Sequence, residues 1–333
     1  MNTRLTALAL AALAVAVTGA TALARPTVPA KNGRIAFVRF DLGLGVKASE
    51  IFVTNPDGTG EQRVTQPPSG YRDDLPDWSP DGSRIVFQRC ALSGGACLVW
   101  SVNPDGTGLE RLSPGCPAGA ACADDRSPVY SADGRHIAFV RTKGKPVLML
   151  ADAKLGRARP LAGLTPSRGN PYGVAWSPNG KQLVFASVND AGSEAKPADG
   201  RALYVVRANG THVRRLTPWA LQAGGQPDWS PDGRRILFHS YSNRLGGFGV
   251  NLYTVRPDGT GLSQVTHVQD SDRVLGGSYS PDGTSIVFST TAGATGATLG
   301  VPDIAVVRAD GTGVKPVTRS ANWDTSPDWG LQR

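Results

Sequence analysis

The sequence lacks several features that would assign a function directly. Only 19% of its 333 residues are charged, and the formal net charge of +8 is spread along the chain without a run of Lys or Arg. Scattered charge of this kind predicts no nucleic-acid binding. No G-x-S-x-G motif occurs, and the four histidines form no motif; His239 and His267 fall at predicted loop entrances. The sequence therefore indicates no nucleophilic hydrolase site.

Long apolar segments are also absent, except at the N-terminus. Arg4 precedes an apolar stretch over residues 5–17, and Ala22-Leu23-Ala24 then matches an A-x-A cleavage site. This order predicts a signal peptide over residues 1–24, and the small and polar residues near its end favour cleavage over the alternative, an uncleaved anchor. We expect an exported protein, periplasmic or extracellular, with no membrane span after signal removal and a short linker over residues 25–32.

Cysteine is scarce, and all four copies lie between residues 90 and 122. In an exported chain an even number of cysteines predicts disulfides, and three pairings are open. We favour Cys90–Cys97 and Cys116–Cys122 because each bond closes one short loop. The C-x6-C and C-x5-C spacings depart from those usual for zinc, so a zinc site is the less favoured alternative.

Glycine (41) and proline (25) are abundant, and they recur in a repeat of about fifty residues. An aromatic-Ser-Pro-Asp-Gly element occurs five times at intervals of 52, 46, 53 and 50 residues, and a last aromatic follows after another 50. Two copies each differ from the element at one position: Ala132 stands in place of Pro, and Asn179 in place of Asp. The aromatic residues of this series are Trp78, Tyr130, Trp176, Trp229, Tyr279 and Trp329.

Each repeat predicts a four-stranded antiparallel unit. Pro-Asp-Gly is a tight-turn signal, and a second turn of the type Asn-Pro-Asp-Gly-Thr-Gly, as in residues 103–108, follows later in each unit, with a degenerate copy at residues 151–156. Between the turns lie short apolar runs without strict alternation, such as Ile85-Val86-Phe87, which are typical of strands buried on both faces. One such unit cannot bury two apolar faces alone, whereas units stacked around an axis can, so the repeat predicts a β-propeller.

The order of strands predicts a closed ring of six blades over residues 33–333. The first unit lacks its innermost strand, and the last residues, around Asp328 and Trp329, supply an unpaired copy of that strand. Pairing the two removes an exposed edge between the first and last blades. We expect the repeat aromatics to pack between blades, and the repeated Asp77, Asp228 and Asp328 to be structural.

The pattern W-S-P-D-G, I-x-F, N-P-D-G-T-G, L-T resembles the WD40-like (PD40) repeats of the TolB-type propeller family. The resemblance covers about residues 31–333 and implies the propeller, without the additional N-terminal α/β domain that TolB carries. A fold of this kind hosts many functions, so the resemblance implies little about the ligand. The same repeat also occurs in propellers attached to prolyl-oligopeptidase-type hydrolases and in some lyases.

The two faces of such a ring differ in sequence. The short turns fall on one face and are nearly uniform; the loops on the other face are long and dissimilar, which is where binding usually resides. The loops that lead into the innermost strands carry our candidate ligand-binding residues: Tyr71, Arg72, Asp73, Asp74, Asp125, Arg126, Tyr172, Trp219, Asp272, Arg273, Trp323 and Asp324. The aromatics of this set are candidates for stacking on a ligand because they lie outside the repeat pattern.

Three roles remain open for the acidic residues of that set. They cap turns and pair with the neighbouring arginines, or contact a peptide or other ligand, or converge on a cation such as Ca²⁺. The first role is favoured. We therefore expect an exported, non-catalytic binding or scaffold protein that engages a protein, peptide or cell-envelope component at the loop-rich face. The alternative is a metal-dependent lyase or hydrolase with a site at the channel mouth; the sequence assigns no catalytic residue and no cofactor.

Overall fold

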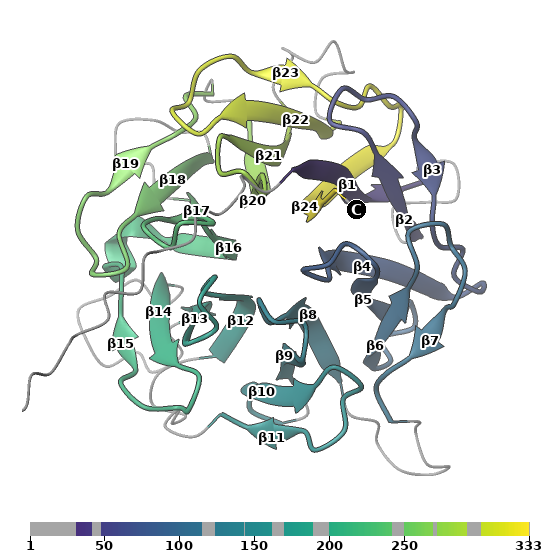
Figure 1. Ribbon diagram of the computed structural model, residues 1–333, viewed down its shortest axis with the longest axis horizontal. Coiled ribbons are helices and arrows are strands. Elements are labelled where there is room, and N and C mark those ends of the chain that lie inside the picture. Colours follow the sequence, from purple (N-terminus) through teal and green to yellow (C-terminus); the bar gives the residue numbers. More distant parts are fainter. Residues whose placement is uncertain are drawn as a thin grey trace, which may run out of the picture.

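The computed structural model describes residues 31–41, 48–114, 124–142, 144–161, 170–188, 200–241, 250–268, 272–291 and 301–332. Six four-stranded antiparallel sheets form a ring around a central axis (Figure 1). A single turn of 3-10 helix, η3 (Trp219–Leu221), joins two of them. No helix within these ranges is long and apolar enough to cross a membrane.

The strands of each blade run from the axis outward. Blade 1 contains β24 (Trp323–Leu331), β1 (Asn32–Phe40), β2 (Ser49–Thr54) and β3 (Gln62–Arg63). Blade 2 contains β4 (Tyr71–Trp78), β5 (Ile85–Ala91), β6 (Cys97–Val102) and β7 (Glu110–Arg111). Blade 3 contains β8 (Asp125–Tyr130), β9 (His136–Arg141), β10 (Val147–Asp152) and β11 (Arg159–Pro160).

The remaining blades repeat this order. Blade 4 contains β12 (Asn170–Trp176), β13 (Gln182–Val188), β14 (Arg201–Arg207) and β15 (Arg214–Arg215). Blade 5 contains β16 (Ala223–Trp229), β17 (Ile236–Ser240), β18 (Asn251–Val255) and β19 (Ser263–Gln264). Blade 6 contains β20 (Val274–Tyr279), β21 (Ser285–Thr290), β22 (Asp303–Arg308) and β23 (Lys315–Pro316).

The ring closes as the strand order predicts. β24, at the C-terminal end of the chain, pairs antiparallel with β1, placing Trp329 opposite Ile35 and Asp324 opposite Arg39. The six-bladed propeller with a C-terminal closing strand is therefore confirmed. Its first strand begins at Asn32, one residue before the predicted boundary.

Hydrophobic cores lie between neighbouring blades. The core between blades 1 and 2 joins Ile51 and Val53 of β2 to Trp78, Ile85 and Phe87. β5 is buried along nearly its whole length, as expected of a strand covered on both faces. The repeat aromatics at Trp229, Tyr279 and Trp329 occupy the same position in other inter-blade cores, which agrees with their predicted packing role.

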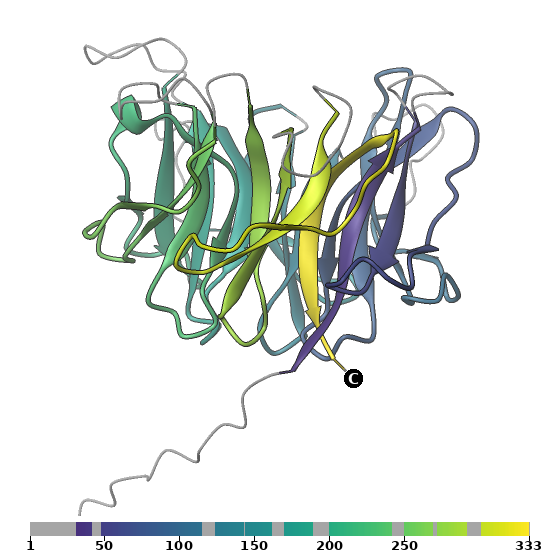
Figure 2. The ribbon, with the colours of Figure 1, turned by 90° about the horizontal axis from the view of Figure 1, so that it is seen from above.

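The two faces of the ring can be followed in Figure 2, where the C-terminus marks the lower face. The innermost strands end at this lower face in the aromatic-Ser-Pro-Asp-Gly turns; we call it the turn face. A backbone bond from Gly82 N to Ser79 O closes one such turn, and Gly134, Gly180, Gly233 and Gly283 repeat that bond. The opposite, upper face receives the connections from second to third strand and from blade to blade. We call it the loop-rich face.

Candidate functional site

The innermost strands bulge where they line a cavity of the central channel. In blade 2, Leu75 and Pro76 lie between the paired residues Asp74 and Asp77, while Phe87 alone fills that interval on β5. The first bulge residue has a positive φ, as at Leu75 (56°) and Ser127 (51°). The left-handed conformation turns the strand, so the residues after it line the channel. Blades 1, 4 and 6 carry the same feature at Ser326, Gly173 and Gly276.

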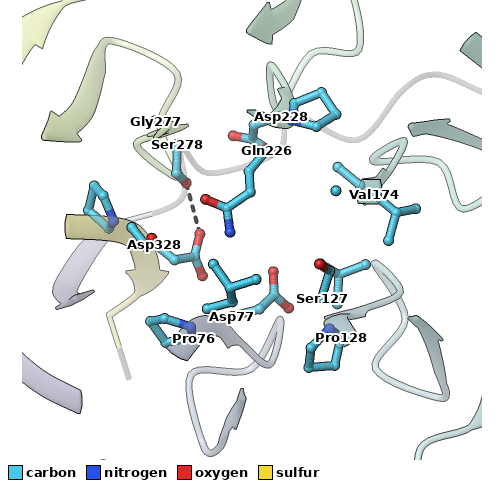
Figure 3. Close-up of a pocket in the computed structure, with 17 residues that line it drawn as sticks. Pro76, Asp77, Ser127, Pro128, Val174, Gln226, Asp228, Gly277, Ser278 and Asp328 are labelled. Carbon is cyan, nitrogen blue, oxygen red and sulfur yellow. Dashed lines mark hydrogen bonds between the residues drawn. The ribbon is translucent and has the colours of Figure 1, made fainter. Parts of the chain in front are cut away.

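All six blades contribute to the cavity of about 60 Å³ at this level (Figure 3). Its polar lining includes Asp77, Asp228 and Asp328, together with Ser278 and Gln226. Figure 3 shows the side chain of Gln226 extending into the cavity. The bulge of blade 5 is one residue longer than that of blade 2, since Gly225, Gln226 and Pro227 lie opposite Phe238 alone. The extra residue explains why a side chain enters the channel from this blade.

The three cavity carboxylates link neighbouring blades. Trp78 N donates to Asp328 Oδ2 at 2.7 Å. Tyr130 N donates to Asp77 Oδ2 at 2.8 Å, and Tyr279 N donates to Asp228 Oδ2 at 2.8 Å. Each carboxylate thus accepts a bond from the repeat aromatic of the next blade. We call these contacts carboxylate latches; they support a structural role for the repeated aspartates.

The other three junctions have different residues at the latch position. Ser278 holds it in blade 6, donates to Asp328 Oδ1 at 2.9 Å and accepts a long bond of 3.4 Å from Trp329 N. Blades 3 and 4 carry Val129 and Ala175, whose side chains cannot accept a hydrogen bond. Blade 4 is therefore joined to both of its neighbours without a carboxylate latch.

Burial raises the pKa of each latch carboxyl, because the charged form loses its hydration inside the ring. The pKa of Asp228 rises to about 7. The negative charge of Asp328 further raises the pKa of Asp77. The channel therefore favours protonated carboxyls at a pH where exposed aspartates are ionised.

At the loop-rich face, the predicted binding residues lie mostly within strands. The prediction placed them in the loops that lead into the innermost strands, but Tyr71 begins β4, Asp125 begins β8 and Trp323 begins β24. This part of the prediction is wrong, because pairing with the second strand extends farther toward the loop-rich face than the apolar pattern indicated. Arg141, for example, lies opposite Asp125, at the start of β8.

Three of the predicted acidic residues form equivalent buried ion pairs. Arg89 Nε donates to Asp73 Oδ1 at 2.6 Å, and Arg141 Nε donates to Asp125 Oδ1 at 2.7 Å. In blade 1, Arg39 Nε donates to Asp324 Oδ1 at 2.7 Å. The three carboxylates are fully buried. Pairing with arginine is thus observed, although the partner comes from the second strand of the same blade and not from the adjacent residue.

The remaining charged candidates lie closer to solvent. Arg72 Nε lies 3.0 Å from Asp74 Oδ2, and Arg126 Nε lies 2.9 Å from Asp124 Oδ1. These two pairs match the predicted pairing of neighbours. Asp272 and Arg273 precede β20, where Arg273 is exposed. Within the described ranges, no three His, Cys, Asp or Glu side chains come together in a group that could hold a metal ion.

The predicted aromatic contacts divide into exposed and buried residues. Tyr71 is 43% exposed and Trp323 is 36% exposed, so both are available to a partner. Trp219 is only 7% exposed and packs edge-on against Tyr204 with their ring centroids 6.0 Å apart. The prediction that Trp219 stacks on a ligand is therefore wrong in this structure, because η3 turns its ring into the core between blades 3 and 4.

Blades 4 and 5 form a second polar cluster, which the sequence indicated only through Tyr172. His239 lies inside β17, not at a loop entrance, and it is 4% exposed. Its ring packs edge-on against Tyr241 with centroids 4.7 Å apart, and Arg201 Cζ lies 4.6 Å from the centroid of the Tyr241 ring. The adjacent Gly224 and Gly225 allow this close packing. We call the side chains of Tyr172, Arg201, His239 and Tyr241 the Tyr172 cluster.

The Cys90–Cys97 disulfide is present and joins β5 to β6 at the loop-rich face. Cys116 and Cys122 lie outside the described residues, so their pairing stays a prediction.

Comparison with known proteins places the chain in a family. The family model described as "TolB beta propeller domain" (PD40) matches residues 125–296, about half of the chain. The chain belongs to this family.

An uncharacterized protein of Agrobacterium fabrum is 27% identical over 220 residues, which are 65% of this chain and 64% of the relative. The Tol-Pal system protein TolB of Anaeromyxobacter dehalogenans is 34% identical over 106 residues, which are 31% of this chain and 21% of that protein. This TolB-family chain therefore spans less than two thirds of either relative.

Among solved structures, TolB from Acinetobacter baumannii aligns with a TM-score of 0.66 and 18% identity, covering 90% of this chain and 66% of that one. At this identity the likeness concerns the fold.

Proposed function

We propose that this protein is an exported, non-catalytic binding protein that engages a protein or peptide of the cell envelope at its loop-rich face. The observation that carries the proposal is the distribution of exposed aromatic side chains. Among the described residues, the exposed Tyr71, Tyr241 and Trp323 all lie at the loop-rich face. Aromatic residues are enriched at protein interfaces because they bury a large area with few rotamers to fix.

The turn face differs in the kind of exposed apolar residue that it carries. Leu109, Leu262 and Val314 are exposed there, and each follows the Thr-Gly of its repeat. Single aliphatic residues of this kind are ordinary on protein surfaces. The contrast between the two faces supports contact through the loop-rich face.

The charged residues support binding at the same face. Asp73, Asp125 and Asp324 are neutralised by arginines and hold the strands, so contacts fall to groups nearer the solvent, such as the partly exposed Arg72 and the exposed Arg273. Export is supported by the signal-peptide pattern in residues 1–24. The similarity to a Tol-Pal system protein supports a place in the cell envelope. The Tol-Pal role itself is not carried over, because the match covers 21% of that relative.

Site-specific photo-crosslinking in cells tests the proposal. A benzophenone side chain at position 241 of the full chain would sample the loop-rich face, and the matched control at position 262 of the same blade would sample the turn face. The two positions are similarly exposed, 41% for Tyr241 and 44% for Leu262. We expect a discrete crosslinked species from position 241 and none from position 262. Equal crosslinking from both positions, or none from either, would refute the proposal.

A Tyr71→Ala/Trp323→Ala double variant gives a second test. Loss of two exposed aromatic anchors should weaken capture of the crosslinked partner by about tenfold or more. Leu109→Ala/Leu262→Ala, on the turn face, is the matched control and should leave capture unchanged. Equal capture by both variants would argue against contact through these aromatics.

A further inference from the structure

The Tyr172 cluster contains two buried hydrogen-bond donors with no acceptor. His239 Nδ1 accepts a long bond of 3.4 Å from Gly276 N, which places the proton of the neutral imidazole on Nε2. Nε2 is buried and has no hydrogen-bond partner among the described residues. A buried donor without an acceptor costs about 1–3 kcal/mol, so such groups are rare and call for an explanation.

The Tyr172 hydroxyl is the second unused donor. It too is buried without a partner in normal hydrogen-bond geometry among the described residues. The backbone N–H of Gly225 lies close enough to the phenolic oxygen to lower the pKa of Tyr172, but an N–H can only donate, so the phenolic proton still lacks an acceptor. Burial nevertheless raises the pKa of Tyr172 to about 12, which keeps this proton in place at neutral pH.

Glycine brings these groups together. A Cβ at Gly224 would lie 3.0 Å from the Tyr172 hydroxyl, 3.0 Å from the Tyr241 ring and 3.4 Å from Arg201 Cδ. A Cβ at Gly225 would lie 1.8 Å from His239 Cε1. The four side chains therefore surround two adjacent glycines of β16, and side chains at those positions would displace them.

Arg201 adds a positive charge to this neighbourhood. Its guanidinium is half-buried against Tyr241, and no acidic partner is observed for it in the described part of the chain. Across the ring, the arginines of blades 1–3 each hold a buried aspartate. At the same position blade 5 has Ala223 opposite Ser240, so it carries neither the aspartate nor the arginine. The chain thus gathers a cation and two unused donors, and supplies no carboxylate to them.

We propose that Tyr172, Arg201 and His239 form a binding site for a carboxylate group of a ligand that enters from the loop-rich face. A carboxylate offers two oxygens that accept from several donors at once, which matches what this cluster lacks. The carboxylate can come from a peptide, as its C-terminus or an acidic side chain, or from a small free carboxylate. A peptide source rests on the proposed function, which this inference deepens.

Histidine-detected NMR of the full chain tests the site, with sodium acetate as the probe and sodium chloride at equal ionic strength as the control. We expect a saturable shift of the His239 imidazole resonances with acetate and none with chloride. Absence of a saturable shift with acetate and with tri-alanine, or an equal shift with chloride, would overturn the proposal.

Peptide probes distinguish the two sources of carboxylate. Tri-alanine with a free C-terminus is compared with tri-alanine amide and with acetate. Tighter binding of the free tripeptide than of either other probe assigns the site to a peptide terminus, and equal binding of tripeptide and acetate assigns it to small carboxylates. Binding of the amide as tightly as the acid would overturn the proposal. Because these probes need no partner protein, their failure leaves the crosslinking result standing as a separate test.

Two conservative variants separate a binding role from a structural one. Tyr172→Phe removes only the unused hydroxyl, and we expect acetate affinity to fall about tenfold while Tm stays the same or rises. Tyr253→Phe, on β18 of blade 5 and outside the cluster, is the matched control, and its affinity should remain within about twofold of wild type. A lower Tm for Tyr172→Phe with unchanged affinity would show a structural hydroxyl and would contradict the proposal.

Discussion

Blades 1–3 and blades 4–6 share one backbone pattern but differ at their loop-rich ends. At the same position of the second strand, blades 1–3 carry Arg39, Arg89 and Arg141, each paired with a buried aspartate. Blades 4–6 carry Ser187, Ser240 and Thr290 there. One half of the ring thus joins its innermost strands by ion pairs, while the other leaves room for the Tyr172 cluster.

We infer that the two halves of the ring divide stability from the proposed binding. In each ion pair of blades 1–3 the arginine neutralises the buried aspartate, so the carboxylate and the guanidinium hold the strands together. Opposite the hydroxyl residues of blades 4–6, the innermost strands carry Pro171, Ala223 and Val274 where blades 1–3 carry the aspartate. We therefore expect substitutions in the aspartate–arginine pairs of blades 1–3 to affect mainly folding, and those in the Tyr172 cluster of blades 4 and 5 to affect binding as well.

The largest effect is expected from breaking one buried pair. Asp73→Ala leaves Arg89, which is 6% exposed, without its partner, and should lower the free energy of unfolding by about 3–5 kcal/mol. Urea denaturation measures this loss. The control is Arg63→Ala, which breaks the exposed contact of 3.6 Å to Glu50 and should cost no more than about 1 kcal/mol. Equal losses would remove the distinction between buried and exposed pairs.

A glycine pair tests the crowding in blade 5. Gly225 and Gly70 both have a positive φ, 82° and 85°, so alanine is strained at either position. Only at Gly225 would the new Cβ meet a side chain, since nothing lies within 4 Å at Gly70. We expect Gly70→Ala to cost about 1 kcal/mol and Gly225→Ala about 3 kcal/mol or more by urea denaturation. Similar costs would mean that His239 moves aside freely.

The disulfide of blade 2 should contribute less than the ion pair beside it. Cys90 and Cys97 are seven residues apart, and a loop of this length constrains the unfolded chain by about 2–3 kcal/mol. A Cys90→Ser/Cys97→Ser double variant should lose about that amount in thermal unfolding. If this double variant loses more stability than Asp73→Ala, the disulfide contributes more than the ion pair and the prediction is wrong.

Removal of the carboxylate latch of blade 5 should change Tm least at neutral pH, and the change should depend on pH. The pKa of Asp228 is raised by burial to about 7 in the folded protein, above its ordinary value of 3.8. Its contribution to stability is therefore fully present below about pH 3.8 and is lost as the pH rises through about 7. Asp228→Asn should flatten this part of the curve of Tm against pH between 4.5 and 8. Val129→Ala, at an unlatched junction, should leave the shape of the curve unchanged, and an unaltered curve for Asp228→Asn would refute the shifted pKa.

Much of the architecture follows from the repeat alone. The aromatic-Ser-Pro-Asp-Gly turns, the short apolar strands and the orphan strand around Trp329 specify six blades and their closure, because these signals are local and recur at a fixed spacing. The distinction between the two faces follows from the same count, since antiparallel strands alternate in direction. The pairing of Cys90 with Cys97 follows from their short separation.

The sites needed the tertiary structure, because their partners come from different strands or blades. Sequence proximity suggested pairing of Asp73 with Arg72, but the register of β4 against β5 gives Asp73 to Arg89. Trp219 looked available because it lies outside the repeat, yet η3 turns it into the core. His239 and Tyr172 lie 67 positions apart, and only the close approach of blades 4 and 5 brings them together. The sequence by itself determined the ring and its two faces; the packing of one blade against the next decided which of the described polar side chains find hydrogen-bond partners and which do not.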